Sequence, residues 1–405
     1  MQFITDIKKE EYIKFTDNHS KAHFLESYGW GQFCGDAKNQ IPHYIGMKDD
    51  NGKLVATALI LEKKMPLGMS YGYSPRGFIL DYNNHELIKK FTNHLKKYMK
   101  DNNYVYIKFD PDIKYQDIDS NAVPIEGGFN NYKLLDFMKS IGYKHKGFNK
   151  LYEGNQPRYT FRINLKKDMD EIDAVMNKSF LKSVKRSYEY DLVIDNNPNV
   201  EDFYRLLQSN SSKDGFNPHS KEYYDAFVKN MGKNMKFFNV SFNPYKLSIK
   251  IKDEIKNQEE LLKTNPKKEA DINNKLTKLN KDYEEFSKME DKDIVVCSLV
   301  CTYTKKYAWS LYIGSDNLAN QTFAVSRSYY EAIKDAHDNG YEFFDLFGTV
   351  GDPNTNYKNL AHLHDFKRKF GDEYIEFIGE FDLVNKPFMY KILPIMLKVY
   401  RKLRR

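Results

Sequence analysis

Residues 85–111 read HELIKKFTNHLKKYMKDNNYVYIKFDP and carry the two patterns that decide the fold. Apolar residues recur at helical spacing over 85–100, which predicts an amphipathic helix. The apolar run at 104–109 then predicts a strand that ends at Asp110-Pro111. A helix that leads into a buried strand is typical of α/β proteins.

The same alternation continues in both directions along the chain. A strand is expected at 53–63, and a helix at 132–141 ends at Gly142, a residue type that closes helices. The pattern restarts near residue 155, so we expect two α/β units, 1–152 and 153–384. Further helices are expected at 168–190, 200–211, 219–231 and 323–339, and further strands at 159–165, 191–194, 236–242, 293–304, 307–313 and 341–347.

Residues 246–292 interrupt the second unit with two apolar stripes of heptad spacing. One stripe covers 251–262 and the other 272–286, joined by a short polar connection. This spacing predicts an inserted antiparallel coiled-coil hairpin that buries its own apolar seam. Lysines and acidic residues balance along it, which favours a solvated coiled coil over an RNA-contacting arm, the open alternative.

The net charge of +7 is concentrated at the C-terminal end. Residues 385–405 contain 7 Lys and Arg residues and no acidic residue. Such a tail can attract phosphate or an anionic membrane surface, or its helix can pack back on the first unit. The N-terminus lacks the apolar core of a secretory signal, and no apolar run is long enough to span a membrane. We therefore expect a cytoplasmic protein, with peripheral contact to the inner membrane face through 385–405 left open.

The usual signatures of nucleotide, metal and serine chemistry are absent from the sequence. It contains no glycine-rich phosphate loop, no HExxH and no GxSxG. Cys34 would need a paired base to act as a nucleophile, and the sequence cannot show one. The pair His362-x-His364 beside Asp365 is a metal candidate by composition, but loop histidines are more often solvated, so no metal site is expected.

The segment 345–371 differs from the rest of the chain. An apolar strand enters a loop rich in Gly, Pro and Asn, and a short basic helix containing Lys367 follows. Loops after the C-terminal ends of strands are where α/β folds place their sites. Lys367 could supply a fixed positive charge to a developing oxyanion, whereas a solvated helix lysine is the alternative.

Short motifs of aromatic, glycine, proline and charged residues are spaced along the chain from about residue 24 to residue 390. They are Tyr28-Gly29-Trp30-Gly31, Ser74-Pro75-Arg76-Gly77-Phe78, Lys108-Phe109-Asp110-Pro111-Asp112, 142–148 (GYKHKGF), Gln156-Pro157-Arg158, Asp214-Gly215-Phe216, Tyr223-Tyr224, Asp345-x-x-Gly348, Phe366-Lys367-x-x-Phe370-Gly371 and 378–382 (IGEFD). As an ordered set they resemble the FemABX family, the aminoacyl-tRNA-dependent transferases that build the interpeptide bridges of peptidoglycan.

The resemblance implies two GNAT-like acyltransferase domains with a coiled-coil arm that is suspected of touching tRNA. It also implies a reaction: the side-chain amine at the third position of a stem peptide attacks the aminoacyl ester of a charged tRNA. The partners would be aminoacyl-tRNA and either lipid II or UDP-MurNAc-pentapeptide. Since the ester is already activated, the reaction needs no cofactor, ATP or metal.

The resemblance also assigns residues. Phe366 and Lys367 match a Phe-Lys pair placed at the reacting ester and the tRNA end, where Lys367 would stabilise the oxyanion or move a proton. Asp110 matches an acidic position that orients or deprotonates the amine, although Asp-Pro after a strand also reads as a plain turn. Tyr223 matches a tyrosine that contacts the nucleotide-sugar pyrophosphate, and Tyr312 approximately matches another.

Two positions depart from the family pattern. Related chains place a lysine four residues after Trp30, but this chain has Cys34 there, and Lys38 is the nearest lysine. His219 stands where the family often has an arginine. Both changes weaken an expected pyrophosphate site, because Lys and Arg serve there as charged donors. The expected substrate-binding set is completed by Arg76, and the choice between lipid II and the nucleotide precursor stays open.

Two other functions compete with an aminoacyltransferase. One is a GNAT-like N-acyltransferase that uses an acyl thioester, although the glycine-rich pyrophosphate loop of that group is missing. The other is a catalytically silent Fem-like binding protein, for which Cys34 and His219 are the best support.

Overall fold

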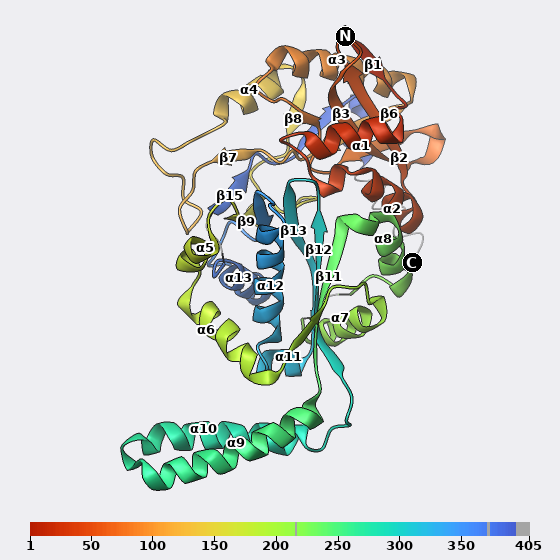
Figure 1. Cartoon of the computed structure of the whole chain (residues 1–405). Helices are drawn as coiled ribbons and strands as arrows, with labels where there is room; N and C mark the ends of the chain where they lie inside the picture. Colours follow the sequence, from red (N-terminus) through yellow and green to blue (C-terminus); the bar gives the residue numbers. More distant parts are fainter. Residues whose placement is uncertain (215–216, 371–372, 394–405) are drawn as a thin grey trace.

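The computed structural model describes residues 1–214, 217–370 and 373–393. Two eight-stranded mixed sheets form an upper and a lower unit, and a pair of long helices projects from the lower one (Figure 1). This confirms the expected α/β class. Over the described residues, no helix is both long and apolar enough to cross a membrane.

The first sheet has the order β1-β2-β3-β4-β6-β16-β8, with β5 paired to β3. Its pairs are antiparallel except for β4 and β6, which run parallel. The strands are β1 Gln2–Ile4, β2 Ile41–Lys48, β3 Leu54–Lys64, β4 Ser70–Ser74, β5 Ile79–Leu80, β6 Tyr104–Phe109, β8 Tyr143–His145 and β16 Phe381–Val384, and the helices of this unit are α1 Lys9–Asn18, α2 Tyr28–Lys38, α3 His85–Asp101 and α4 Tyr132–Ser140.

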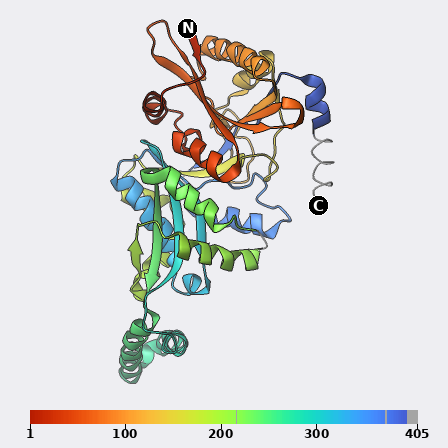
Figure 2. The same ribbon diagram turned by 90° about the vertical axis from the view of Figure 1, so that its right-hand side faces the viewer.

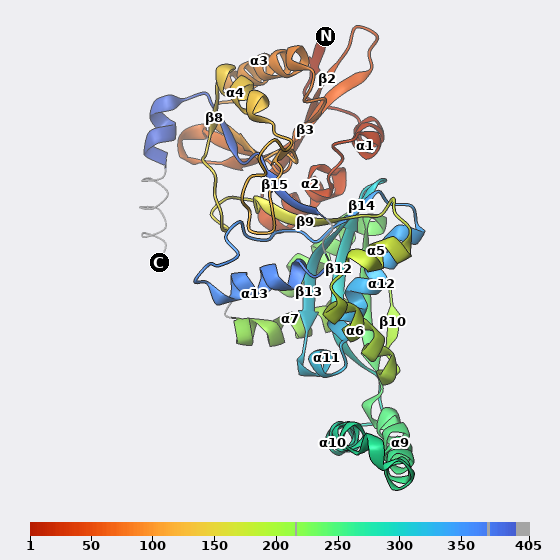
Figure 3. The same cartoon turned by 90° about the vertical axis from the view of Figure 1, so that its left-hand side faces the viewer.

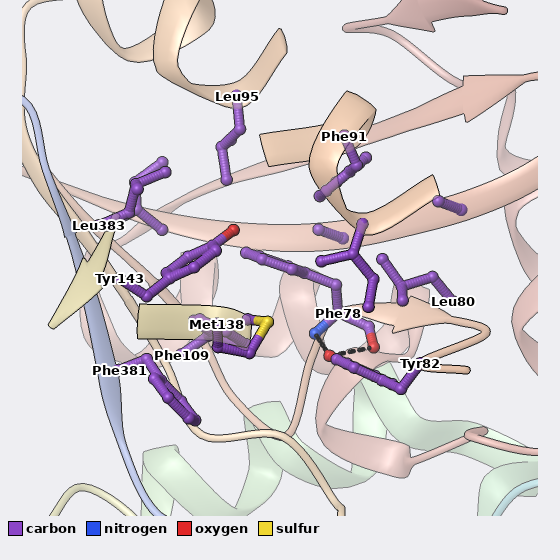
Figure 4. Close-up of a cluster of buried hydrophobic side chains, with 14 of the residues drawn as sticks. Phe78, Leu80, Tyr82, Phe91, Leu95, Phe109, Met138, Tyr143, Phe381 and Leu383 are labelled. Atoms are coloured by element: carbon purple, nitrogen blue, oxygen red, sulfur yellow. Dashed lines mark hydrogen bonds between the residues drawn. The ribbon is translucent and has the colours of Figure 1, made fainter. Parts of the chain in front are cut away.

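Helix α3 and strand β6 occur where the opening stretch predicts them. Asn84 caps α3 by accepting a hydrogen bond from the Leu87 amide. The apolar face of the helix packs on the sheet, where Phe91 and Phe109 are fully buried. Figure 4 shows this core, with the Tyr82 hydroxyl bonded to the backbone of Phe78.

The second sheet has the order β10-β11-β12-β13-β14-β9-β15-β7. Strands β13 and β14 run parallel but pair only over Tyr307–Trp309. The strands are β7 Lys114–Gln116, β9 Tyr159–Asn164, β10 Val193–Asp195, β11 Met235–Phe242, β12 Ile294–Tyr303, β13 Tyr307–Ser315, β14 Phe343–Asp345 and β15 Glu373–Phe377, and the helices are α5 Met169–Val175, α6 Lys178–Ser187, α7 Val200–Asp214, α8 Lys221–Met231, α11 Asn317–Gln321, α12 Ala324–Asp338 and α13 Lys358–Lys367.

The two sheets exchange strands across the expected boundary. β7 comes from the first part of the chain but pairs with β15 of the second sheet, and β16 returns to lie between β6 and β8. The crossing from β15 to β16 passes through Gly379, whose φ of 98° suits glycine. The ranges 1–152 and 153–384 therefore do not coincide with the sheets, and the division into domains stays a prediction.

The units also share one apolar cluster. Phe24, Trp30 and Phe33 of the first unit pack with Phe227 and Trp309 of the second. Such a continuous core fixes the units against each other, so residues from both can build one site.

Two expected elements differ from the structure. The helix expected over 168–190 is divided into α5 and α6, because Met176 and Asn177 are extended and the Asn177 side chain caps α6. The strand expected over 341–347 is limited to β14, since Phe347 turns away with a φ of 51°.

The segment that interrupts the second unit, expected at 246–292, forms α9 Pro244–Thr264 and α10 Glu269–Phe286, which lie side by side (Figure 1). Glu254 and Lys275 pair between them at 2.6 Å. The hairpin was expected to bury only its own apolar seam. At its base, however, Phe286 is fully buried in a cluster with residues of the second sheet. The Tyr190 hydroxyl also donates to Asp282 at 3.2 Å. The supercoiling of a coiled coil stays a prediction.

The chain after β16 packs on the first sheet. Asn385 donates to the Tyr104 carbonyl at 2.8 Å, and the Tyr390 hydroxyl donates to Asp382 at 2.6 Å. Figure 2 shows this segment beside the first unit. The basic residues expected at 394–405 lie outside the described residues, as do Gly215-Phe216 and Gly371 of the quoted motifs.

Candidate active site

Lys367 closes α13 and is buried, not solvated. Its side chain turns under the loop that follows β14, and its Nζ donates to the carbonyls of Phe347 and Gly348, the second at 2.8 Å. Only 8% of the residue is exposed. Figure 3 shows α13 on the lower unit, below β9 and β15. A buried ammonium or amine held by two carbonyls has one orientation, as a catalytic group requires.

The surroundings of Lys367 tune its charge. Burial lowers the pKa of Lys367 to about 7, and the negative charge of Asp345 opposes this shift. The group can therefore gain or lose a proton near neutral pH, which suits a group that stabilises charge or transfers a proton.

Phe366, the neighbour of Lys367, faces the core of the second unit. Its ring packs against Tyr329 at 5.5 Å and Phe370 at 5.0 Å, measured between ring centroids. It remains partly exposed. The structure therefore gives Phe366 a part in fixing the end of α13.

Asp110 lies at the end of β6 and is 3% exposed. Its two carboxylate oxygens accept hydrogen bonds from the Arg76 amide at 2.7 Å and the Tyr73 hydroxyl at 2.8 Å. Burial raises the pKa of Asp110 to about 6, although Arg76 opposes the shift. A carboxyl with this pKa can accept a proton from an amine near neutral pH.

Arg76 and Asp110 face one hollow between the units. The Arg76 guanidinium stacks on Phe377 at 4.2 Å and donates to the Pro157 carbonyl at 2.6 Å. The hollow is small and partly open to solvent. Its remaining lining residues are Gly147, Asn149, Gly154, Gln156, Arg158, Gly379 and Glu380.

Pro157 joins this hollow to the Lys367 loop. A Cβ added to Gly348 would lie 2.4 Å from the Pro157 ring, so the Gly348 backbone packs directly against that ring, and only glycine fits there. Lys367 binds the Gly348 carbonyl on one side of this contact. On the other side, Arg76 binds the Pro157 carbonyl through its guanidinium and Asp110 through its backbone amide.

A second group of expected substrate-binding residues gathers between α2 and α8. The Tyr223 and Tyr312 hydroxyls are 3.2 Å apart, and the His219 ring stacks on Tyr223 with centroids 3.9 Å apart. The Lys38 ammonium lies 4.7 Å from the centroid of Trp30 and 5.7 Å from that of Tyr223. Residues from three separate parts of the sequence therefore lie together, and their role in substrate binding stays a prediction.

Aromatic rings connect the two groups. Trp30 contacts Phe24 at 5.6 Å between ring centroids, and Phe24 contacts Phe347 at 5.9 Å. The Phe347 carbonyl in turn accepts from Lys367. Both groups thus lie along the junction of the units.

Several polar residues at this junction were not predicted. Tyr73 holds Asp110, and Arg158 and Glu380 line the hollow. The last two stand inside quoted motifs, so a signal for them was present in the sequence. His364 also differs from expectation, because it is fully buried and its Nδ1 lies 3.1 Å from the Thr349 hydroxyl. Within the described ranges, no group of three His, Cys, Asp or Glu residues could hold a metal ion.

Comparison with known proteins covers nearly the whole chain. A lipid II:glycine glycyltransferase of Staphylococcus epidermidis is 25% identical over 99% of this chain and 98% of its own length. Aminoacyltransferase FemA of Staphylococcus aureus is 24% identical over 95% of this chain and 96% of its own.

The fold has a solved counterpart as well. The crystal structure of FemX superposes with a TM-score of 0.79 at 22% identity, covering 97% of this chain and 100% of that one. The model of the FemAB family matches residues 7–398. The chain is therefore a member of the FemAB family.

Proposed function

We propose that this protein transfers an amino acid from aminoacyl-tRNA to the stem-peptide amine of a peptidoglycan precursor. The relatives named above are aminoacyltransferases, one of them acting on lipid II, and the match to them runs from end to end. The observation that carries the proposal is the placement of Lys367 and Asp110 on either side of the contact between Pro157 and Gly348.

The geometry supports a simple sequence of steps. The acceptor amine loses a proton to Asp110 and attacks the carbonyl carbon of the ester, so a C–N bond forms. Lys367 stabilises the oxyanion that develops on the carbonyl oxygen, and the ester C–O bond then breaks. The tRNA hydroxyl leaves with a proton that Lys367 can supply. Because the ester is already activated, the proposed reaction uses no separate cofactor.

Lipid II is the acceptor that we propose first. The group of Lys38, His219, Tyr223 and Tyr312 offers one ammonium, one imidazole and two hydroxyls to a pyrophosphate. Burial lowers the pKa of His219, so this residue is a weaker charged donor than an arginine. An acceptor held at a membrane by its lipid depends less on that charge than a soluble nucleotide precursor, since it is already concentrated there.

The decisive experiment supplies the purified protein with a mixture of charged tRNAs and either lipid II or UDP-MurNAc-pentapeptide. The expected product is an acceptor heavier by one or more amino acid residues, identified by its mass. A parallel reaction with acetyl-CoA tests the thioester alternative. No mass gain on either acceptor, under conditions where a FemA protein is active on its own substrate, would refute the proposal.

A further inference from the structure

Arg162 on β9 lies between two carboxylates from distant parts of the chain. Its Nε donates to Asp345 at 2.7 Å, and its second guanidinium nitrogen pairs with Asp112. Asp345 ends β14 of the second sheet, whereas Asp112 lies in the link that leads from β6 of the first sheet to β7 of the second. We infer that Arg162 is a positioning residue. It fixes the part of the active site around Lys367 relative to the part around Asp110. This inference rests on the proposed function.

The connection toward Lys367 runs through Asp345. One oxygen of Asp345 binds Arg162, while the other accepts from the Phe347 amide at 2.7 Å and the Thr160 hydroxyl at 2.6 Å. The bond to Phe347 fixes a turn whose φ of 51° is uncommon for a side-chain-bearing residue. That turn presents the two carbonyls that bind Lys367.

The connection toward Asp110 runs through Asp112, two residues further along the chain. Lys21 donates to the Asp112 backbone carbonyl at 3.1 Å, and His23 lies 3.9 Å from its carboxylate. Although burial opposes it, the charge of Arg162 holds the pKa of Asp112 well below its usual range. The segment that begins at Asp110 is therefore fixed by an ionised carboxylate.

Only an arginine can make this bridge. Its planar guanidinium presents several N–H donors in a fixed fork, whereas a lysine ammonium is a single point charge. Arg162 also stacks on Phe343 at 4.3 Å and on Phe377 at 5.3 Å, which orients the fork. The Arg76 guanidinium stacks on Phe377 as well. The bridge and the hollow beside Asp110 therefore share one supporting ring.

Hydrogen exchange measured by mass spectrometry tests the bridge without any substrate. In Arg162→Lys we expect faster amide exchange both at 110–116 and at 345–350, with α3 unchanged. The control is Arg205→Lys, which alters an ion pair with Asp202 inside the second unit, 2.9 Å long and half exposed. A change in only one of the two segments, or in neither, would overturn the bridge.

Kinetics test whether the bridge matters for the reaction. Transfer to the peptide amine needs both sides in register, and a misplacement of about 1 Å can lower kcat by roughly 100-fold. Hydroxylamine is a small amine that reaches the ester without binding beside Asp110. In Arg162→Lys we therefore expect peptide transfer to fall about 100-fold at unchanged KM, while enzymatic hydroxamate formation from aminoacyl-tRNA stays near the wild-type rate.

Each kinetic result decides one point. Equal losses with both nucleophiles would mean that Arg162 acts on Lys367 alone, and no loss with either would remove it from the active site. Arg162→Gln should lose at least as much peptide transfer as Arg162→Lys. If the wild type transfers nothing to a peptide, the proposed function fails, while hydrogen exchange still decides whether Arg162 bridges the two segments.

Discussion

Replacing Lys367 by methionine is the most direct test of the active site. Methionine has a similar length and no branch, so it can follow the path of the lysine under the Phe347–Gly348 turn. What it removes is the terminal nitrogen and its bonds to two carbonyls. The substitution therefore separates the chemistry of Lys367 from its packing.

The magnitude follows from the burial of the group. A preorganised donor in a water-excluded site typically contributes about 100- to 1000-fold to kcat, and Lys367 is 8% exposed. We expect Lys367→Met to transfer at least about 100-fold more slowly, with little change in KM for the acceptor. Stability should change less, because two carbonyls lose a donor, at about 1–3 kcal/mol each, while the desolvation of an amine is relieved.

Single-turnover transfer, followed by the mass of the acceptor, measures the chemical step directly. Lys369→Met serves as the control, since Lys369 is only partly buried and two residues away. Lys367→Arg should recover only part of the rate, because a guanidinium cannot occupy the position of a compact ammonium. Wild-type turnover in a folded Lys367→Met protein would refute the assigned role.

Three further outcomes are expected. The transfer rate should rise with pH through about 6 as Asp110 ionises and fall through about 7 as Lys367 loses its proton, and Asp110→Asn should abolish the rising limb; a rate independent of pH between 5 and 8 would contradict both roles. Lys38→Met should raise KM for the acceptor about tenfold or more, as expected when a charged donor is lost, and an unchanged KM would place the pyrophosphate elsewhere. Replacing 258–272 by a short glycine turn should leave the thermal unfolding transition in place, because the buried base of the arm is kept; a markedly lower midpoint would show that the outer part supports the fold.

The pH dependence of stability also has a definite sign. The pKa of Lys367 is lower in the folded protein than the usual 10.5 of a lysine in an unfolded chain. Between about 7 and 10.5 the unfolded chain therefore binds a proton that the folded protein does not, so the free energy of unfolding rises with pH. Lys367→Met should lack this increment, and parallel stability curves for the two proteins would show that Lys367 stays protonated.

Local sequence patterns predicted the elements well where neighbours in the chain determine them. The helix and strand over 85–109 match α3 and β6, since amphipathic spacing and an apolar run depend on adjacent residues. The membership of β16 and β7 in their sheets could not be predicted, because a strand of three or four residues carries no signal for its partner. The same limit applies to Arg162, whose acidic partners lie 50 and 183 positions away.

The cysteine at position 34 illustrates how helix geometry corrects a position-by-position reading. Compared position by position with related chains, Cys34 suggests that the residues proposed to bind pyrophosphate lack a positive charge. Lys38 follows about one turn later on the same side of α2, and helical side chains point back toward the N-terminus. Its ammonium therefore returns to the Trp30 ring, and burial there lowers the pKa of Lys38. A longer reach from the next turn can thus restore the charge that Cys34 lacks, which favours an active acceptor site over a silent binding protein.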